Sequence, residues 1–158
     1  SGRTPYVLGA VAAATERGGF VVGISSNPGS ELARAVEVPV TLATGPEVIS
    51  GSTRMKAATA TKLVLNMIST AAMIRLGHVY GNLMVNVQPA NSKLADRALR
   101  ILAQTAGISK ESAAAMMEAS GGELKTAILM ARVGVDAAEA RRRIDAAQGR
   151  LSEALENG

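Results

Sequence analysis

The sequence predicts an α/β fold in its first part and an all-helical second part. Three patterns indicate this: a strand–helix–strand run over residues 20–42, a long apolar helical segment over residues 53–76, and a 27-residue internal repeat near the end. Short β-branched runs bounded by turn residues are typical of buried parallel strands, and such a run is joined to the next by a right-handed crossover. We therefore expect a small parallel sheet in residues 1–88 and a helical domain in residues 89–158.

Composition narrows the chemistry that the chain can perform. Its 158 residues are 47% hydrophobic but 2% aromatic, so the core should consist of Ala, Val, Leu, Ile and Met. There is no cysteine and one histidine, His78, which excludes disulfides, thiolate catalysis and a histidine-rich metal site. We expect neither a metal nor a cofactor. His78 could serve as an acid or base, or be an ordinary surface residue past a helix end.

The net charge of +4 suits an anionic small ligand. Aromatic stacking residues and a long basic cluster are lacking, which argues against nucleic acid as a partner. No apolar run of membrane-spanning length is free of charged and polar residues, and the first residues do not form a signal peptide. We therefore expect a cytoplasmic protein with no membrane partner.

The chain begins with a loop, Ser1 to Thr4, that leads into a helix. Pro5 suits the first helical position, and Gly18-Gly19 should end the helix after Arg17. Serine and threonine hydroxyls beside unpaired N–H groups at a helix start can bind a phosphate. The residues alone leave two roles open for Thr4: a plain N-cap, or a phosphate ligand.

The strand–helix–strand run follows. Residues 20–25 and 38–42 are the predicted strands, and Ser30 should cap the helix between them. In an open parallel sheet, ligands bind beyond the carboxyl ends of the strands. Ser25-Ser26-Asn27 and Gly45-Pro46-Glu47 are at such ends, which predicts a binding site there.

The junction before the long helix is the strongest candidate for an anion site. Ser52 is the expected N-cap of a helix over residues 53–76. The first turn of a helix offers unpaired N–H groups and the positive end of the dipole. Hydroxyl and cationic side chains are added there by Ser52, Thr53, Arg54 and Lys56. The alternative is an ordinary capped helix with its cations in solvent.

Glu47, in the loop before this helix, also has two interpretations. It could act as a general base or bind a sugar hydroxyl, or it could be an exposed acid that pairs with Arg54 or Lys56. The second half of the helix is apolar on nearly every face, which predicts burial all round. A polar stripe runs along one side of the helix, and it either faces solvent or points into a site or a subunit contact. Its members are Thr59, Lys62, Asn66 and Ser69.

A resemblance is carried by this junction. The segments Gly45-Pro46-Glu47-Val48-Ile49 and Gly51-Ser52-Thr53-Arg54-Met55-Lys56, followed by Thr59 and Lys62, resemble the signature of the N-acetylmuramic acid 6-phosphate etherases, bacterial enzymes of cell-wall sugar recycling. The similarity runs from Ser1 through Val79–Val85 to the helical tail. One departure is Ala58, where the family usually has glycine. The chain is similar to the C-terminal part of these longer enzymes only.

The resemblance implies a fold and a reaction. The fold is the C-terminal portion of a sugar isomerase (SIS) domain, followed by a small helical domain like ubiquitin-associated (UBA) domains. The reaction is that of a lyase, which cleaves the D-lactyl ether of N-acetylmuramic acid 6-phosphate by elimination and hydration. The family assigns proton transfer to two glutamates in the part that precedes this chain, so no catalytic residue is expected here, and the fragment alone should be inactive.

The resemblance also implies roles for individual residues. The loop from Ser1 to Thr4 is similar to the one that holds the sugar phosphate in SIS domains. The expected substrate-binding residues are Ser1, Thr4, Glu47, Ser52, Thr53, Arg54 and Lys56. The family forms homodimers in which each active site borrows from the neighbour, and the helix over residues 53–76 is expected at that contact. Two other functions stay open: a non-catalytic sugar-phosphate-binding regulator, and a helical protein-interaction module.

The second part begins with an ambiguous stretch. Alternation from Leu83 to Val87 is strand-like, but the resemblance favours mostly helix over residues 78–88, and we adopt helix. A helix capped by Asn91 or Ser92 should then run to Ala106. Beyond it, residues 107–128 align with residues 134–155 at an offset of 27, with Ser109 and Asp136 as paired N-caps. Each repeat is predicted to be a helix, a glycine turn and a second helix. We prefer a role as a lid or dimer-packing element, and a protein-binding module is the alternative.

Overall fold

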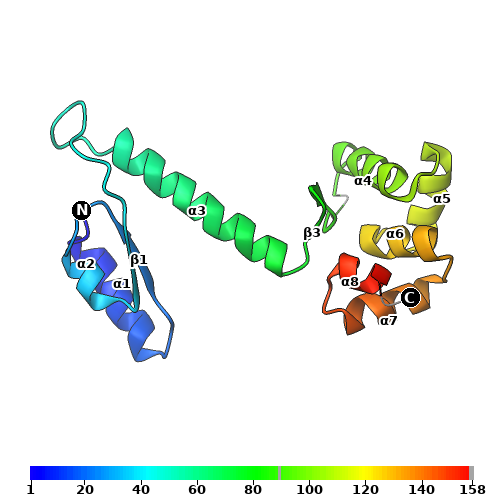
Figure 1. The fold of residues 1–158 in the computed structure, drawn as a ribbon, viewed down its shortest axis with the longest axis horizontal. Helices are drawn as coiled ribbons and strands as arrows, with labels where there is room; N and C mark the ends of the chain where they lie inside the picture. The colour runs from blue at the N-terminus through cyan, green and yellow to red at the C-terminus, as the bar shows by residue number, and fades with distance from the viewer. Residues whose placement is uncertain (89, 157–158) are drawn as a thin grey trace. The chain divides into compact units, whose positions relative to one another are not determined.

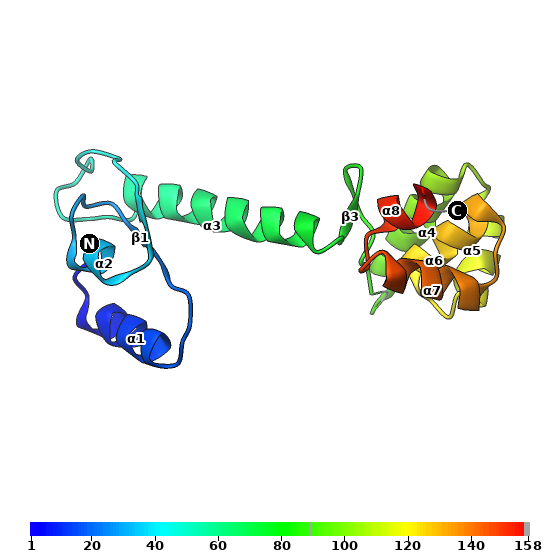
Figure 2. The same ribbon diagram turned by 60° about the horizontal axis from the view of Figure 1, so that its bottom comes forward.

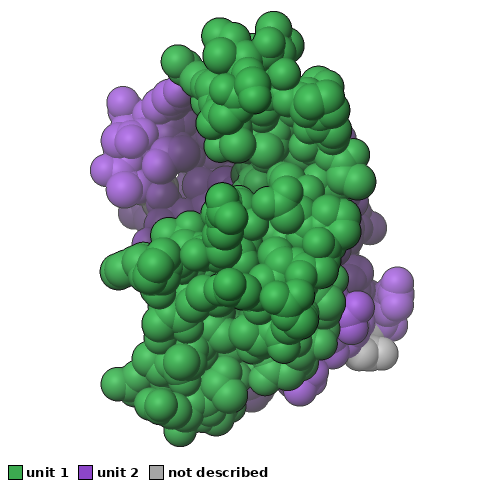
Figure 3. All heavy atoms as spheres, turned by 90° about the vertical axis from the view of Figure 1, so that its left-hand side faces the viewer, with its two compact units in different colours: residues 1–69 green, residues 70–158 purple. Residues whose placement is uncertain are grey.

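The computed structural model describes residues 1–88 and 90–156 and forms two compact units, residues 1–69 and 70–158 (Figures 1 and 3). The boundary between the units lies inside helix α3. The predicted domain boundary between residues 88 and 89 stays a prediction. A division into compact units does not show which segments fold independently. In chain order the elements are α1 (Pro5–Glu16), β1 (Val22–Ser25), α2 (Glu31–Ala35), β2 (Val38–Thr41), α3 (Lys56–Arg75), β3 (Val79–Tyr80), β4 (Leu83–Met84), α4 (Ser92–Ala106), α5 (Lys110–Ala119), α6 (Leu124–Val133), α7 (Ala137–Ala146) and α8 (Leu151–Glu156).

The first unit contains the predicted strand–helix–strand run. β1 and β2 pair in parallel, from Val22 opposite Val38 to Ser25 opposite Thr41, and α2 connects them. α2 packs against both strands and against α1, and its Leu32 is buried. Ser30 caps α2, as predicted, because its side chain accepts a hydrogen bond from the backbone N–H of Ala33. The α/β class is therefore confirmed, and this small sheet is compatible with part of a SIS domain.

α3 differs from the prediction in two ways. It begins at Lys56 rather than at Thr53, so Ser52 is not its N-cap. None of its residues is buried, although its apolar sequence predicts burial; Leu63 and Leu65 are each 53% exposed. The physical reason is that no helix or strand of the described residues packs extensively along it.

α3 also has the length and composition of a membrane-spanning helix. An 18-residue window within it reaches a mean hydropathy of 1.3, and no other helix of the described residues does so. This one helix is weak evidence for a membrane protein, since the core helices of water-soluble proteins give the same result.

Residues 79–84 form a β-hairpin, so the prediction of helix there is wrong. β3 and β4 pair antiparallel, with Tyr80 opposite Leu83, and Gly81 makes the turn at φ +57°. This backbone conformation favours glycine and stops a helix. Val85 and Val87 are buried while the residues between and around them are exposed, which is the alternation of an extended segment packed on one side.

The helices of the second unit begin as the sequence predicts. Asn91, Ser109 and Asp136 each accept a hydrogen bond from a backbone N–H in the first turn, at 2.9, 3.2 and 2.8 Å respectively. α5 and α7 begin 27 residues apart, as do α6 and α8. Helices α4 to α8 gather together in the ribbon (Figure 2). A single apolar core joins them and the extended segment, and its fully buried large side chains include Leu102, Ile128, Leu129 and Leu151. Likeness to a UBA domain remains a prediction.

Candidate anion-binding site

The loop before α1 brings two hydroxyl groups together. Ser1 Oγ lies 3.3 Å from Thr4 Oγ1, and both side chains are exposed. Thr4 is in the N-cap position, but its side chain makes no capping hydrogen bond. The Thr4 hydroxyl therefore does not cap α1 in this structure.

The N-terminus of α1 has unpaired N–H groups beside these hydroxyls. Pro5 has no N–H, and the described residues provide no hydrogen-bond acceptor for the backbone N–H of Tyr6 or Val7. The next N–H, of Leu8, donates to the carbonyl of Thr4 at 3.1 Å. Two hydroxyls, two backbone donors and the positive end of a 12-residue helix dipole are thus available to one anion.

The N-terminus of α3 is arranged differently, because an internal carboxylate occupies it. Glu47 Oε2 accepts a hydrogen bond from the N–H of Lys56, and Glu47 Oε1 accepts one from the N–H of Ala57, both at 3.0 Å. These two backbone hydrogen bonds lower the pKa of Glu47 below its usual value of 4.5. Lys56 Nζ donates to the carbonyl of Pro46 at 3.0 Å and so closes the same loop. Glu47 is a half-buried acid, and it pairs with backbone N–H groups rather than with the side chains of Arg54 or Lys56.

This arrangement predicts a pH-dependent helix start. Because the folded-state pKa of Glu47 is depressed, its stabilising contribution is present above the ordinary pKa of 4.5 and is lost as the pH falls through the folded-state value. We expect the amide protection factors of Lys56 and Ala57 to fall over that acidic range, and to be low at neutral pH in Glu47→Ala. Hydrogen exchange followed by NMR measures both.

The matched control for that experiment is Glu16→Ala. Glu16 is an exposed glutamate at the end of α1, and it makes no side-chain hydrogen bond within the described residues. Its replacement should leave the protection factors of Lys56 and Ala57 unchanged. Equal protection in Glu47→Ala and in the unmodified chain would show that Glu47 does not cap α3.

Ser52, Thr53 and Arg54 lie in the turn that precedes α3. The backbone of this turn is held by hydrogen bonds from Ser52 N to Ile49 O at 3.0 Å and from Ala58 N to Thr53 O at 3.1 Å. The three side chains make no hydrogen bond or ion pair within the described residues. They are therefore available to a ligand, and their role in binding stays a prediction.

The structure thus separates the predicted site residues into two groups. One group is Ser1 and Thr4 before α1, and the other is the loop from Glu47 to Lys56 before α3. No hydrogen bond or ion pair joins the two groups within the described part of the chain. Gly2 and Ser30, which support the first group, are not among the predicted site residues. Asn27 also supports it and belongs to the segment at the end of β1 where the sequence predicts a binding site.

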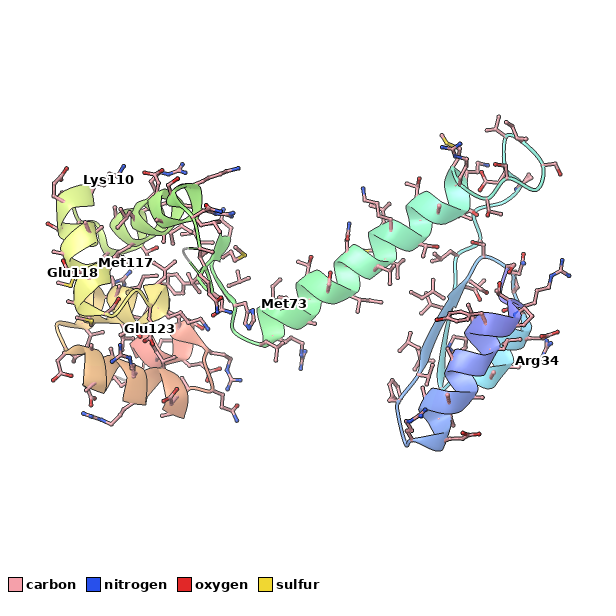
Figure 4. The ribbon with its side chains drawn as sticks, turned by 180° about the vertical axis from the view of Figure 1, so that it is seen from behind. Arg34, Met73, Lys110, Met117, Glu118 and Glu123 are labelled. Atoms are coloured by element: carbon pink, nitrogen blue, oxygen red, sulfur yellow. The ribbon has the colours of Figure 1, made fainter. Side chains whose placement is uncertain are left out.

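The second unit has a pocket in which two of the basic side chains, Arg141 and Lys125, are already hydrogen-bonded. It has a volume of about 490 Å³ and lies between residues 85–88 and helices α6 and α7. Arg141 Nε donates to Glu123 Oε2 at 2.8 Å, and Lys125 Nζ donates to the carbonyl of Gly149 at 2.8 Å; Glu123 is labelled in Figure 4. Burial lowers the pKa of Lys125. Within the described residues, no cluster of three or more potential metal ligands occurs.

The whole chain is similar in sequence to curated enzymes of one name. It is 54% identical over 158 residues to an N-acetylmuramic acid 6-phosphate etherase of Rubrobacter xylanophilus, and 48% identical over 158 residues to one of Deinococcus radiodurans. A relative of the same name from an Enterobacter species is 50% identical over 157 residues. The chain is homologous to the C-terminal part of these etherases.

The resemblance noted in the sequence is therefore confirmed. The alignments include all or 99% of the chain but 52 or 53% of each relative, so the chain spans about half the length of the curated etherases that it matches. No family model matches it.

Proposed function

We propose that the chain is the sugar-phosphate-binding part of a lyase that cleaves the D-lactyl ether of N-acetylmuramic acid 6-phosphate. The products would be N-acetylglucosamine 6-phosphate and D-lactate, formed in the cytoplasm during recycling of cell-wall amino sugars. The observation that carries this proposal is the identity of 48–54% to curated etherases along the whole chain. The open N-terminus of α1, with the hydroxyls of Ser1 and Thr4, supports a phosphate site in the same chain.

We propose that residues outside this chain perform the proton transfers. Elimination needs a base that removes a proton beside the sugar carbonyl and an acid that protonates the departing ether oxygen. Glu47 is a poor candidate for the acid, because two backbone N–H groups stabilise its ionised form and lower its pKa. An ionised carboxylate has further lone pairs, and these suit a sugar hydroxyl. We therefore propose that Glu47 contacts substrate and transfers no proton.

We also propose that α3 contributes to a homodimer. Large apolar side chains remain exposed along α3 and its C-terminal end: Leu63, Leu65, Met67, Ile68, Met73, Ile74 and Leu76. Met73 is labelled in Figure 4. A helix with so much exposed apolar surface gains free energy by packing against another surface. A second copy of the protein would provide such a surface.

A hybrid protein tests the etherase function. The N-terminal part of the Rubrobacter xylanophilus etherase, joined to residues 1–158, restores the length of the curated relatives. We expect this hybrid to release D-lactate from N-acetylmuramic acid 6-phosphate but not from the unphosphorylated sugar, and the 158-residue chain alone to release none. The unmodified Rubrobacter enzyme is the control. A folded hybrid that binds N-acetylglucosamine 6-phosphate but releases no D-lactate would favour a regulator instead.

A further inference from the structure

The backbone of the Ser1–Thr4 loop is fastened by the turn that follows β1. Asn27 Nδ2 donates a hydrogen bond to the carbonyl of Ser1 at 2.8 Å. The N–H of Leu32, in the first turn of α2, donates to the carbonyl of Gly2 at 2.9 Å. Two consecutive carbonyls of the loop are therefore held by one neighbouring segment, although the two segments are about 26 residues apart in the sequence.

Gly2 allows the close approach that these hydrogen bonds require. Its φ is +71°, a conformation that residues with a side chain rarely adopt. A Cβ atom at this position would lie 2.4 Å from Ser30 Oγ and 2.6 Å from Ser30 Cβ. The loop and the turn after β1 are thus in direct contact, and this contact restricts the conformation of the loop.

The turn that carries Asn27 is itself fixed from the sheet. Ser25, the last residue of β1, is buried, and its hydroxyl donates to the carbonyl of Asn27 at 3.1 Å. The same hydroxyl lies 3.1 Å from Ser30 Oγ, which in turn accepts from the N–H of Ala33 at 3.3 Å. The backbone of Asn27 is therefore held by a partly buried hydroxyl network, and its side chain in turn holds the carbonyl of Ser1.

We propose that Asn27 is a positioning residue for phosphate binding. By fixing the carbonyl of Ser1, it directs the Ser1 hydroxyl toward Thr4 and the N-terminus of α1, so that the donors are arranged before the ligand arrives. The inference rests on the proposed function, because it takes the Ser1–Thr4 loop as the phosphate-binding loop. Asn27 acts through Ser1, and none of its own atoms needs to touch the sugar.

The chemistry of the side chain makes the role testable. The Ser1 carbonyl requires a donor, which the amide of asparagine provides and a carboxylate does not. Asn27→Asp therefore keeps the size of the side chain, removes the hydrogen bond and adds a negative charge near the bound phosphate. Asn27→Ala removes the hydrogen bond without adding the charge, and Asn27→Gln keeps a donor on a longer stem.

The experiment is an NMR titration of the 158-residue chain with N-acetylglucosamine 6-phosphate and, separately, with N-acetylglucosamine. In the unmodified chain we expect the Tyr6 and Val7 amide signals to shift with the phosphorylated sugar only. Asn27→Ala should weaken this binding about tenfold, which is the order of the cost of ordering one residue on binding. Asn27→Asp should weaken it further, and Asn27→Gln should recover part of the loss.

Two controls separate positioning from a general loss of structure. The signals of β1 and β2 should stay unchanged in the Asn27 variants, and Asn82→Asp, the same substitution in the β3–β4 turn, should bind as the unmodified chain does. If the unmodified chain shows no phosphate-dependent shifts at Tyr6 and Val7, the phosphate site of the proposed function is wrong and the inference falls with it. If the unmodified chain binds and Asn27→Asp binds equally well, only the positioning role is wrong.

Discussion

Replacing Leu102 with alanine is expected to destabilise the second unit by about 2–5 kcal/mol, the range for a leucine truncated to alanine in a packed core. Leu102 lies in α4, is fully buried and belongs to the single apolar core of the unit. The core lacks buried aromatic side chains among its members, so each aliphatic side chain contributes a large share of the buried apolar area. Thermal unfolding followed by circular dichroism at the helix band measures the loss.

Leu63→Ala is the matched control, because it makes the same chemical change on α3. Leu63 is 53% exposed and has little contact to lose, so the unfolding temperature of the 158-residue chain should stay nearly unchanged. In the hybrid, by contrast, Leu63→Ala should weaken self-association if α3 contributes to a dimer. Equal destabilisation by the two substitutions in the 158-residue chain would contradict the burial that the structure assigns to them.

The elements that the sequence predicts well are those whose signals are local. Ser30, Asn91, Ser109 and Asp136 each cap the helix that follows them, and a cap acts within its own first turn. The strands β1 and β2 are β-branched runs with turn residues at both ends. Such features are visible from a few neighbouring residues, and the structure has them where they were expected.

The features that the sequence does not predict depend on distant residues. Burial of α3 requires other elements or chains that pack against it. An apolar helix sequence indicates only that such packing would be favourable. The cap of α3 comes from Glu47, and the geometry that brings a carboxylate back to the helix start depends on the whole intervening loop. The hairpin at residues 79–84 has local signals, Gly81 and the alternation after it, but the family resemblance favours helix there and so predicts the wrong structure.

The candidate site also combines local features with long-range ones. Hydroxyl and basic residues at two helix starts were found from the sequence, because their chemistry is local. Local chemistry does not predict which of the two helix N-termini has unpaired N–H groups for a ligand. α1 has no side-chain cap, whereas the N-terminal N–H groups of Lys56 and Ala57 in α3 are already paired with a carboxylate. The balance between two sites that look equivalent in the sequence therefore depends on one long-range contact.

Removing the hydroxyls of Ser1 and Thr4 together is expected to abolish recognition of the phosphate. A hydrogen bond to a charged group contributes about 1.5–3 kcal/mol, so two such losses correspond to a weakening of roughly 100-fold or more. The double variant Ser1→Ala with Thr4→Val, made in the hybrid, should lose this affinity for N-acetylglucosamine 6-phosphate. Its affinity for N-acetylglucosamine should not change, because the unphosphorylated sugar makes no use of these donors. Isothermal titration calorimetry with the two sugars measures the difference.

The comparison with the junction before α3 decides where the phosphate binds. Replacing Ser52, Thr53 and Arg54 with alanine should weaken binding of both sugars to a similar degree, because Glu47 already supplies the negative charge at that helix start. If instead this triple variant lost the preference for the phosphorylated sugar while the Ser1 and Thr4 variant kept it, the phosphate would lie at α3. Glu47 would then have to leave the N–H groups of Lys56 and Ala57, and the protection factors of those two amides would change on ligand binding.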